Sequence, residues 1–153
     1  MGVLSRWPLR LRFRRLIDDS RLQAAGCRLQ ANQMARDHRK LKVFGMADAL
    51  VLDVYRRTRG FPVEERYGLQ AQIRRAAVSI PTNIVEGSAR RTTKDYLHFL
   101  TVALGSASEV RYLLGLSRRL GILDTADHGA LDSRCSELLP ALQGLIAALE
   151  RRP

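Results

Sequence analysis

The chain has 153 residues, of which 46% are apolar, 27% charged and only 6% aromatic. This length suits one domain with one core, and abundant leucine and alanine favour helices over sheets. No run of about 18 apolar residues is present, so the sequence predicts no membrane-spanning helix. Its two cysteines, Cys27 and Cys135, form neither a disulfide framework nor a metal-ligand cluster, so we expect a reducing, cytoplasmic setting and no metal or other cofactor.

Positive charge is concentrated near the N-terminus. The formal net charge is +11, and residues 1–40 contribute +7 of it through ten Lys and Arg against three acidic residues. Residues 41–153 hold sixteen Lys and Arg against twelve acidic residues and contribute the remaining +4. Such charge favours polyanions, RNA or DNA above all. The alternative is a solvated basic surface without a partner.

Residues 1–39 form an arginine-rich extension ahead of the domain predicted over 40–153. Arginines interrupt its apolar residues, so it does not read as a secretory signal. A basic amphipathic segment can lie on a membrane or on RNA. Alternatively, translation starts at Met34 and the preceding residues are a dispensable arm.

The first helical pattern starts at Leu41 and ends at "RGFP" (59–62). There Gly60 can adopt positive φ, Pro62 can begin the next helix, and Glu64 and Glu65 suit the positive end of its dipole. Apolar residues recur at intervals of three and four along one face: Val43, Ala47, Leu50, Val51 and Val54.

The second pattern has two faces and ends near Gly87 and Ser88. Its apolar face holds Leu69, Ile73, Ala76, Ala77, Ile80 and Ile84. A polar stripe beside it holds Gln72, Arg75, Ser79, Asn83, Glu86 and Arg90. Both stripes follow from a turn of about 100° per residue.

The third helix should begin at Thr92, which forms a variant capping box with Asp95. The small stretch Gly105–Ser108 should let a neighbouring backbone approach closely. Its apolar face holds Tyr96, Phe99, Leu100, Ala103, Ala107, Val110 and Leu114.

A fourth helix should follow Asp124 as N-cap, with a kink or a late start at Pro140. Its apolar face holds Leu131, Cys135, Leu138, Leu142, Leu145, Ile146 and Leu149. Four amphipathic helices with short connections predict an all-α, up-and-down four-helix bundle.

Pro81 lies inside the second helix, where it removes one hydrogen bond and costs about 3 kcal/mol. In a structural interpretation it bends the helix, and Ser79, Asn83 and Glu86 form a hydrogen-bonded network at a helix or subunit contact. In a functional one the kink exposes Asn83 and Glu86 in a site. We favour the structural interpretation, because nucleophiles and metal ligands are missing around it.

Two stretches, "QIRRAAVSIPTNIVEG" (72–87) and "RRTTKDYLHFLTVALGSASEV" (90–110), carry a family resemblance. They resemble the small bacterial four-helix-bundle proteins encoded in intervening sequences of 23S rRNA genes, a family that includes accessory variability determinant proteins of diversity-generating retroelements. Residues 40–62 fit the family's first helix. Val85 departs from the pattern, which often has alanine there, and residues 1–39 lie outside it.

The resemblance implies a left-handed bundle that assembles into a homopentameric barrel. Its retroelement branch implies an accessory role, with a reverse transcriptase and nucleic acid as partners. We expect the motif residues to serve structure and assembly: Gln72, Ser79, Pro81, Asn83, Glu86, Gly87, Gly105 and Ser106.

Nucleic acid should contact basic residues on the second helix and at its junction with the third: Arg74, Arg75, Arg90, Arg91 and Lys94. Without interleaved aromatic residues, single-strand sequence readout is not expected. The alternative is a structural interaction scaffold with incidental charge.

We expect no catalytic residues. The best enzyme hypothesis pairs Arg91 with His98, seven residues apart and so on one helix face, at a spacing that resembles small helical ribonucleases of the HEPN type. An imidazole can act there as general acid or base and arginine can stabilise the phosphorane. A lone histidine at helical spacing is usually structural, however.

Overall fold

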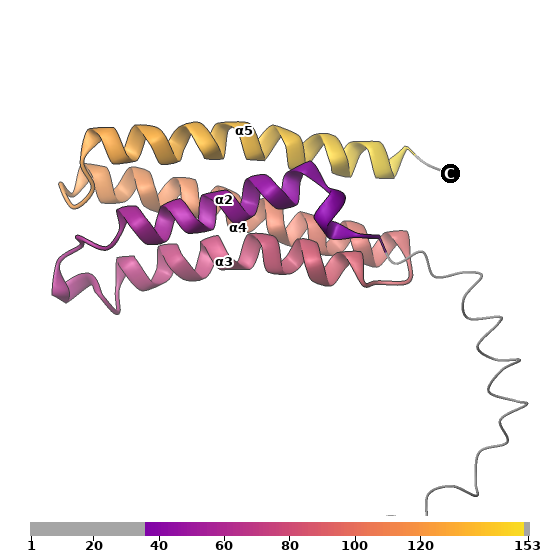
Figure 1. Cartoon of the computed structure of the whole chain (residues 1–153), viewed down its shortest axis with the longest axis horizontal. Coiled ribbons are helices and arrows are strands. Elements are labelled where there is room, and N and C mark those ends of the chain that lie inside the picture. The colour runs from indigo at the N-terminus through magenta and orange to yellow at the C-terminus, as the bar shows by residue number, and fades with distance from the viewer. Residues whose placement is uncertain (1–35, 152–153) are drawn as a thin grey trace, which may run out of the picture. The chain divides into compact units, whose positions relative to one another are not determined.

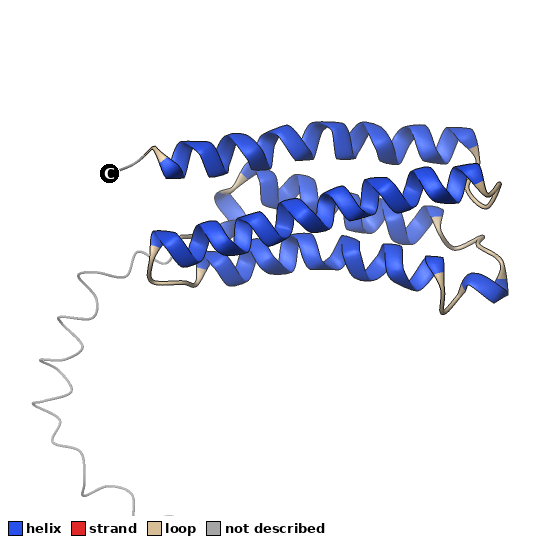
Figure 2. Ribbon diagram, turned by 180° about the vertical axis from the view of Figure 1, so that it is seen from behind, coloured by secondary structure: helices blue, strands red, loops and turns tan. Residues whose placement is uncertain are grey.

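The computed structural model describes residues 36–151, which form four α-helices and two short 3-10 turns. The elements are η1 (His38–Lys40), α2 (Lys42–Arg57), η2 (Val63–Glu65), α3 (Leu69–Ser88), α4 (Thr93–Arg119) and α5 (Thr125–Glu150). The four α-helices lie lengthwise beside one another, and consecutive helices run in opposite directions (Figure 1). Only helices and loops occur in this part of the chain (Figure 2). The predicted all-α four-helix bundle is therefore confirmed for these residues.

The predicted N-terminal extension and the proposed start at Met34 lie outside the described residues. Packing against the bundle nevertheless begins before the predicted boundary at residue 40. Arg36 donates a hydrogen bond to Thr93 Oγ1 at 3.3 Å, and its guanidinium carbon lies 4.6 Å from the ring centroid of Tyr96. The first described residue thus already contacts α4.

The core is built from the apolar faces that the sequence predicts. Five residues of the predicted faces are only partly buried: Val51, Leu69, Phe99, Leu145 and Ile146. Serines at positions 88, 106 and 117, in contrast, are buried among the helices. Most of the predicted faces are at least nine-tenths buried: Val43, Ala47, Leu50, Val54, Ile73, Ala76, Ala77, Ile80, Ile84, Tyr96, Leu100, Ala103, Ala107, Val110, Leu114, Leu131, Cys135, Leu138, Leu142 and Leu149. Three- and four-residue spacing therefore identifies the core side of every helix.

Both predicted N-caps are confirmed. Thr92 Oγ1 accepts from the Asp95 N–H at 3.0 Å, and Asp124 Oδ1 accepts from the Asp127 N–H at 2.7 Å. The capping box differs in its return bond, because the Thr92 hydroxyl itself donates to Asp95 Oδ2 at 2.6 Å. An aspartate is one methylene shorter than the usual glutamate, which accounts for that change.

The connection from α2 to α3 departs from the prediction. Gly60 does not adopt positive φ; among the described residues only Gly121 does. Pro62 precedes the turn η2, and α3 begins later, at Leu69. The Leu69 N–H donates to Glu65 Oε2 at 2.8 Å, so the acidic residue satisfies the helix start as expected of a carboxylate near the dipole. A Cβ at Gly68 would lie 2.7 Å from that oxygen, which is the end of a flexible side chain and can shift aside.

Proline does not interrupt either helix that contains it. Pro81 lies inside α3 and Pro140 inside α5. The predicted late start of the last helix is wrong, since α5 begins at Thr125. Pro140 and Ser136 are both exposed, so water can bond the Ser136 carbonyl that the proline leaves without a donor.

α3 and α4 pack closely at Gly87. A Cβ added there would lie 2.8 Å from Phe99 Cβ and 3.0 Å from Tyr96 Cδ2. At Gly105, where the sequence predicts close approach, an added Cβ would meet no atom within 4 Å. Among the described residues, Gly87 is therefore the glycine at which two helices of the bundle pack closely.

Replacing Gly87 should open the contact between α3 and α4. Gly87→Ala should lower the free energy of unfolding by about 1–3 kcal/mol, because Phe99 Cβ sits near the backbone and has little room to move. Gly144→Ala is the matched control, because this position is exposed on α5 with open space around it. Its free energy of unfolding should rise by at most about 1 kcal/mol, since alanine has the higher helix propensity. Urea unfolding followed by circular dichroism measures both, and equal stability of the two variants would contradict this packing role.

Candidate functional site

The turn of α3 around Pro81 is held by side-chain donors. Because proline has no N–H, the Ala77 carbonyl loses its helical partner. Thr82 Oγ1 donates to the Val78 carbonyl at 2.8 Å, and Asn83 Nδ2 donates to the Ser79 carbonyl at 2.7 Å. These bonds hold the turn that contains the proline.

A short polar network joins this turn to α4. Asn83 Nδ2 donates to Ser79 Oγ at 3.0 Å, and Ser79 Oγ lies 2.9 Å from Ser106 Oγ. Ser106 Oγ donates to the Val102 carbonyl at 3.0 Å, so its single proton is used and Ser79 is the donor between the two hydroxyls. Glu86 is not part of this network and pairs with Arg90. The role of these residues in assembly stays a prediction.

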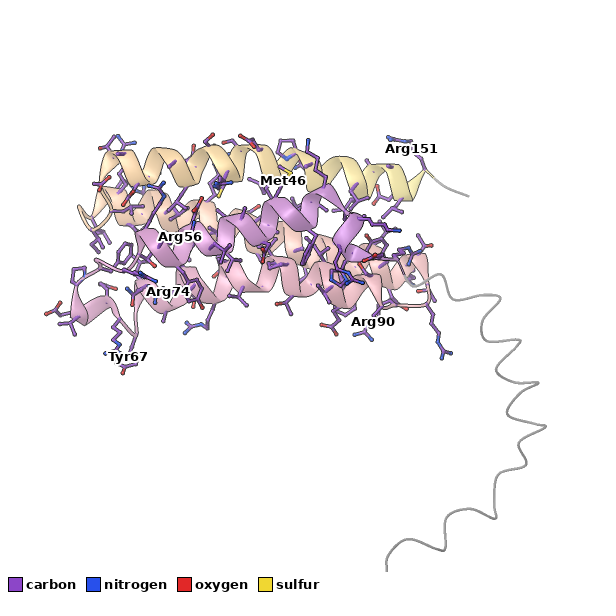
Figure 3. All side chains as sticks on the ribbon, in the orientation of Figure 1. Met46, Arg56, Tyr67, Arg74, Arg90 and Arg151 are labelled. Carbon is purple, nitrogen blue, oxygen red and sulfur yellow. The ribbon has the colours of Figure 1, made fainter. Side chains whose placement is uncertain are left out.

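A shallow groove of about 650 Å³ follows the exposed side of α3. Asn83 and Glu86 line it toward the C-terminal end of α3. Toward the other end it is lined by two tyrosines and three arginines: Tyr55, Tyr67, Arg66, Arg74 and Arg75. Figure 3 shows Tyr67 and Arg74 near the same end of the molecule. The groove thus combines aromatic faces with positive charge.

The two adjacent arginines of α3 have different surroundings. Arg74 Nε donates to Thr58 Oγ1 at 2.9 Å and Arg74 Nη2 to the Tyr55 carbonyl at 3.4 Å. Its guanidinium also lies 4.8 Å from the Tyr55 ring centroid. Arg75 is exposed and donates to Gln72, which in turn donates to Glu109 on α4. Arg74 therefore ties α3 to α2, whereas Arg75 is a surface cation.

A second group of cations lies where α3 passes into α4; we call Arg36, Arg90, Arg91 and Lys94 the basic end. Arg36 joins it through its hydrogen bond to Thr93. Arg90 pairs with Glu86, and its guanidinium lies 4.5 Å from the Phe99 ring centroid. Arg91 and Lys94 are exposed and have no ion-pair partner within residues 36–151. Within the basic end, these two cations are the most available to an external phosphate.

The geometry does not support the spacing argument for Arg91 and His98. α4 begins at Thr93, so Arg91 precedes the N-cap and does not share a helical face with His98 by the seven-residue rule. The exposed His98 ring meets the Phe99 ring edge-on, with centroids 5.6 Å apart. The ribonuclease hypothesis is therefore left without its geometric basis.

Two buried titratable groups in the described region, Cys135 and Tyr96, have shifted pKa values. Burial raises the pKa of the Cys135 thiol to about 11 and also raises the pKa of Tyr96. No cluster of three or more His, Cys, Asp or Glu side chains there is arranged to hold a metal ion. None of the helices described combines the length and the apolar character needed to cross a membrane.

The sequence pattern does not predict that Tyr55 and Tyr67 line one groove. Tyr55 belongs to α2, Tyr67 to the connection before α3, and Arg75 to α3. Residues on three different segments share no helical spacing, so periodicity cannot group them. The available signal was the large aromatic residue in the polar stretch "EERYG", which marks an exposed ring.

Comparison with known proteins identifies a family and a fold. The family model described as 23S rRNA-intervening sequence protein matches residues 39–144. A crystal structure from Bacteroides thetaiotaomicron, of a protein with unknown function from the S23 ribosomal protein family, superposes with a TM-score of 0.64. The two chains are 21% identical, and the match covers 68% of this chain and 97% of the other. No curated protein matches this chain.

The contrast between Arg74 and Arg75 can be measured. Arg74→Ala should lower the free energy of unfolding by about 1–2 kcal/mol, because it removes a charged donor from Thr58 and a cation from the Tyr55 ring. Arg75→Ala is the neighbouring control and should change stability by less than about 0.5 kcal/mol. Chemical denaturation of both variants measures these changes. An Arg74→Ala variant as stable as the unmodified protein would contradict the role of Arg74 in joining α2 to α3.

Proposed function

Because the chain belongs to the family of 23S rRNA-intervening sequence proteins, we propose that it is a non-enzymatic, self-associating bundle that binds RNA or DNA through its basic surface. The basic end is the observation that carries this proposal. It brings Arg36 together with Arg90, Arg91 and Lys94, which lie more than 50 residues further along the chain. A cytoplasmic location belongs to the same proposal.

The distribution of charge supports binding at this end. Residues 36–151 hold eighteen Lys and Arg against thirteen acidic residues, or +5. Residues 1–35 hold seven Arg against two Asp, another +5, and the chain joins them to the bundle at Arg36. The +5 of residues 1–35 therefore precedes, in the same chain, Arg36 of the basic end. Phosphate neutralisation by such groups releases counterions and makes affinity depend strongly on salt.

Self-association is supported by the exposed side of α3 and α4. Val85 and Val102 are 38% and 39% exposed, and Gly105 has open space around it in the middle of α4. An exposed glycine costs a helix about 1 kcal/mol, which close packing by a second copy would offset. The pentamer number and the reverse transcriptase partner rest on the family resemblance alone. In a pentamer, each cation of the basic end would occur five times.

A structural scaffold is the second candidate function. Much of the positive charge is engaged within the bundle: Arg57 pairs with Asp127, Arg111 with Asp132, and Arg134 with Asp53. Arg74 is likewise committed to α2. If the remaining cations have no polyanionic partner, assembly and protein contacts would be the whole function.

Charge reversal at the basic end separates these two functions. Arg91→Glu combined with Lys94→Glu should weaken binding of a labelled structured RNA and lower the salt slope by about two units, one for each phosphate that is no longer neutralised. Fluorescence anisotropy at several salt concentrations measures both quantities. Arg74 is left unchanged because its replacement would disturb the fold.

The matched control reverses the same charge elsewhere. Arg118→Glu combined with Arg119→Glu alters two exposed cations at the C-terminal end of α4, away from the basic end. This variant should retain most of the salt slope. Equal weakening in both variants would point to net charge rather than a site, and no binding by the unmodified protein at low salt would favour the scaffold.

Assembly has its own test. Gly105→Leu should reduce the mass of the oligomer in light scattering, because the new side chain would occupy the space through which a second copy approaches. Gly144→Leu is the control, since that glycine is also exposed and has no atom within 4 Å of an added Cβ. Unchanged mass in both variants would exclude the α4 face from the contact.

A further inference from the structure

The end of the groove nearest the start of α3 has an unusual composition; we call Tyr55, Arg66, Tyr67, Arg74 and Arg75 the Tyr–Arg end. Tyr67 is 84% exposed and Tyr55 is 42% exposed. Exposed tyrosine rings are common where a partner binds, because the ring is apolar and its hydroxyl is polar. The groove that they line has about 650 Å³, within the usual range for a bound ligand.

Each ring is accompanied by a guanidinium. The carbon of the Arg66 guanidinium lies 5.8 Å from the Tyr67 ring centroid, and that of Arg74 lies 4.8 Å from the Tyr55 centroid. Arg74 is fixed by its bonds to Thr58 and the Tyr55 carbonyl. Arg66 and Arg75 have no ion-pair partner among the described residues. Aromatic faces and unpaired guanidinium groups therefore share one surface.

We propose that the Tyr–Arg end is a subsite for single-stranded nucleic acid, in which bases stack on Tyr67 and Tyr55 and phosphates bind Arg66 and Arg75. Tyrosine rings accept any base through its π-face, and arginine binds phosphate with paired N–H donors. A duplex hides its base faces in its own stack, so only an unpaired strand can use these rings. The inference rests on the proposed function and specifies which form of nucleic acid this groove takes.

This subsite is separate from the basic end. The basic end lies at the junction of α3 and α4, whereas Tyr67 precedes the start of α3. Figure 3 shows Arg90 and Tyr67 at opposite ends of the bundle. Charge alone explains attraction at the basic end, but the tyrosines add a preference for bases that charge cannot supply.

The test compares two labelled strands on the full chain. One is an oligouridine of about 12 nucleotides, within the site sizes of known single-strand binders; the other has the same phosphates but abasic residues. The base-bearing strand should bind at least about fivefold more tightly, as expected for one stacked base. Tyr67→Ala should reduce this preference, because only the Tyr55 ring remains, and Tyr67→Phe, which keeps the ring, should retain it in full.

Tyr112→Ala is the control for loss of an exposed tyrosine. Tyr112 is 62% exposed on α4 and does not line the groove, so the preference for bases should remain. Equal affinity of the unmodified protein for both strands would overturn the subsite and leave the proposed function standing. A preference that is undiminished in Tyr67→Ala would also overturn it, and failure of both strands to bind at low salt would overturn both proposals.

Discussion

Close packing of α3 against α4 is the constraint on which the rest of the bundle depends. These two helices share the most extensive contact in the described chain. Gly87 lets the backbone of α3 approach Tyr96 and Phe99, and the hydroxyls of Ser79 and Ser106 meet 2.9 Å apart. The missing side chain of Gly87 sets how closely α3 and α4 can approach. The directed hydrogen bond between the serines sets the register of the two helices.

This packing decides which side of α3 faces water. With Ile73, Ile80 and Ile84 buried, the opposite side of the helix is left as the floor of the groove. Asn83 lies between the two sides, bonded to Ser79 and lining the groove. The polar stripe therefore forms hydrogen bonds to α4 along one edge and an open surface along the other.

Arginine in this protein serves two purposes that composition cannot separate. Arg74 joins α3 to α2 through Thr58, and Arg90 lies between Glu86 and the Phe99 ring. Arg91 and Arg75 are exposed on the surface. A guanidinium that is bonded within the fold has fewer donors left for a phosphate, so local geometry matters more than the net charge of +11.

The sequence by itself determined the four helices, their buried faces, and the N-caps at Thr92 and Asp124, because helical periodicity and capping depend on neighbours within four residues. It also contained the motif that led to the family. Only the tertiary structure decided that Gly87 rather than Gly105 permits close packing between helices of one chain, that Arg74 is held by α2, and that Tyr55 and Tyr67 share a groove with Arg75. These are contacts between separate segments, and their distances follow from how the helices pack rather than from spacing along the chain.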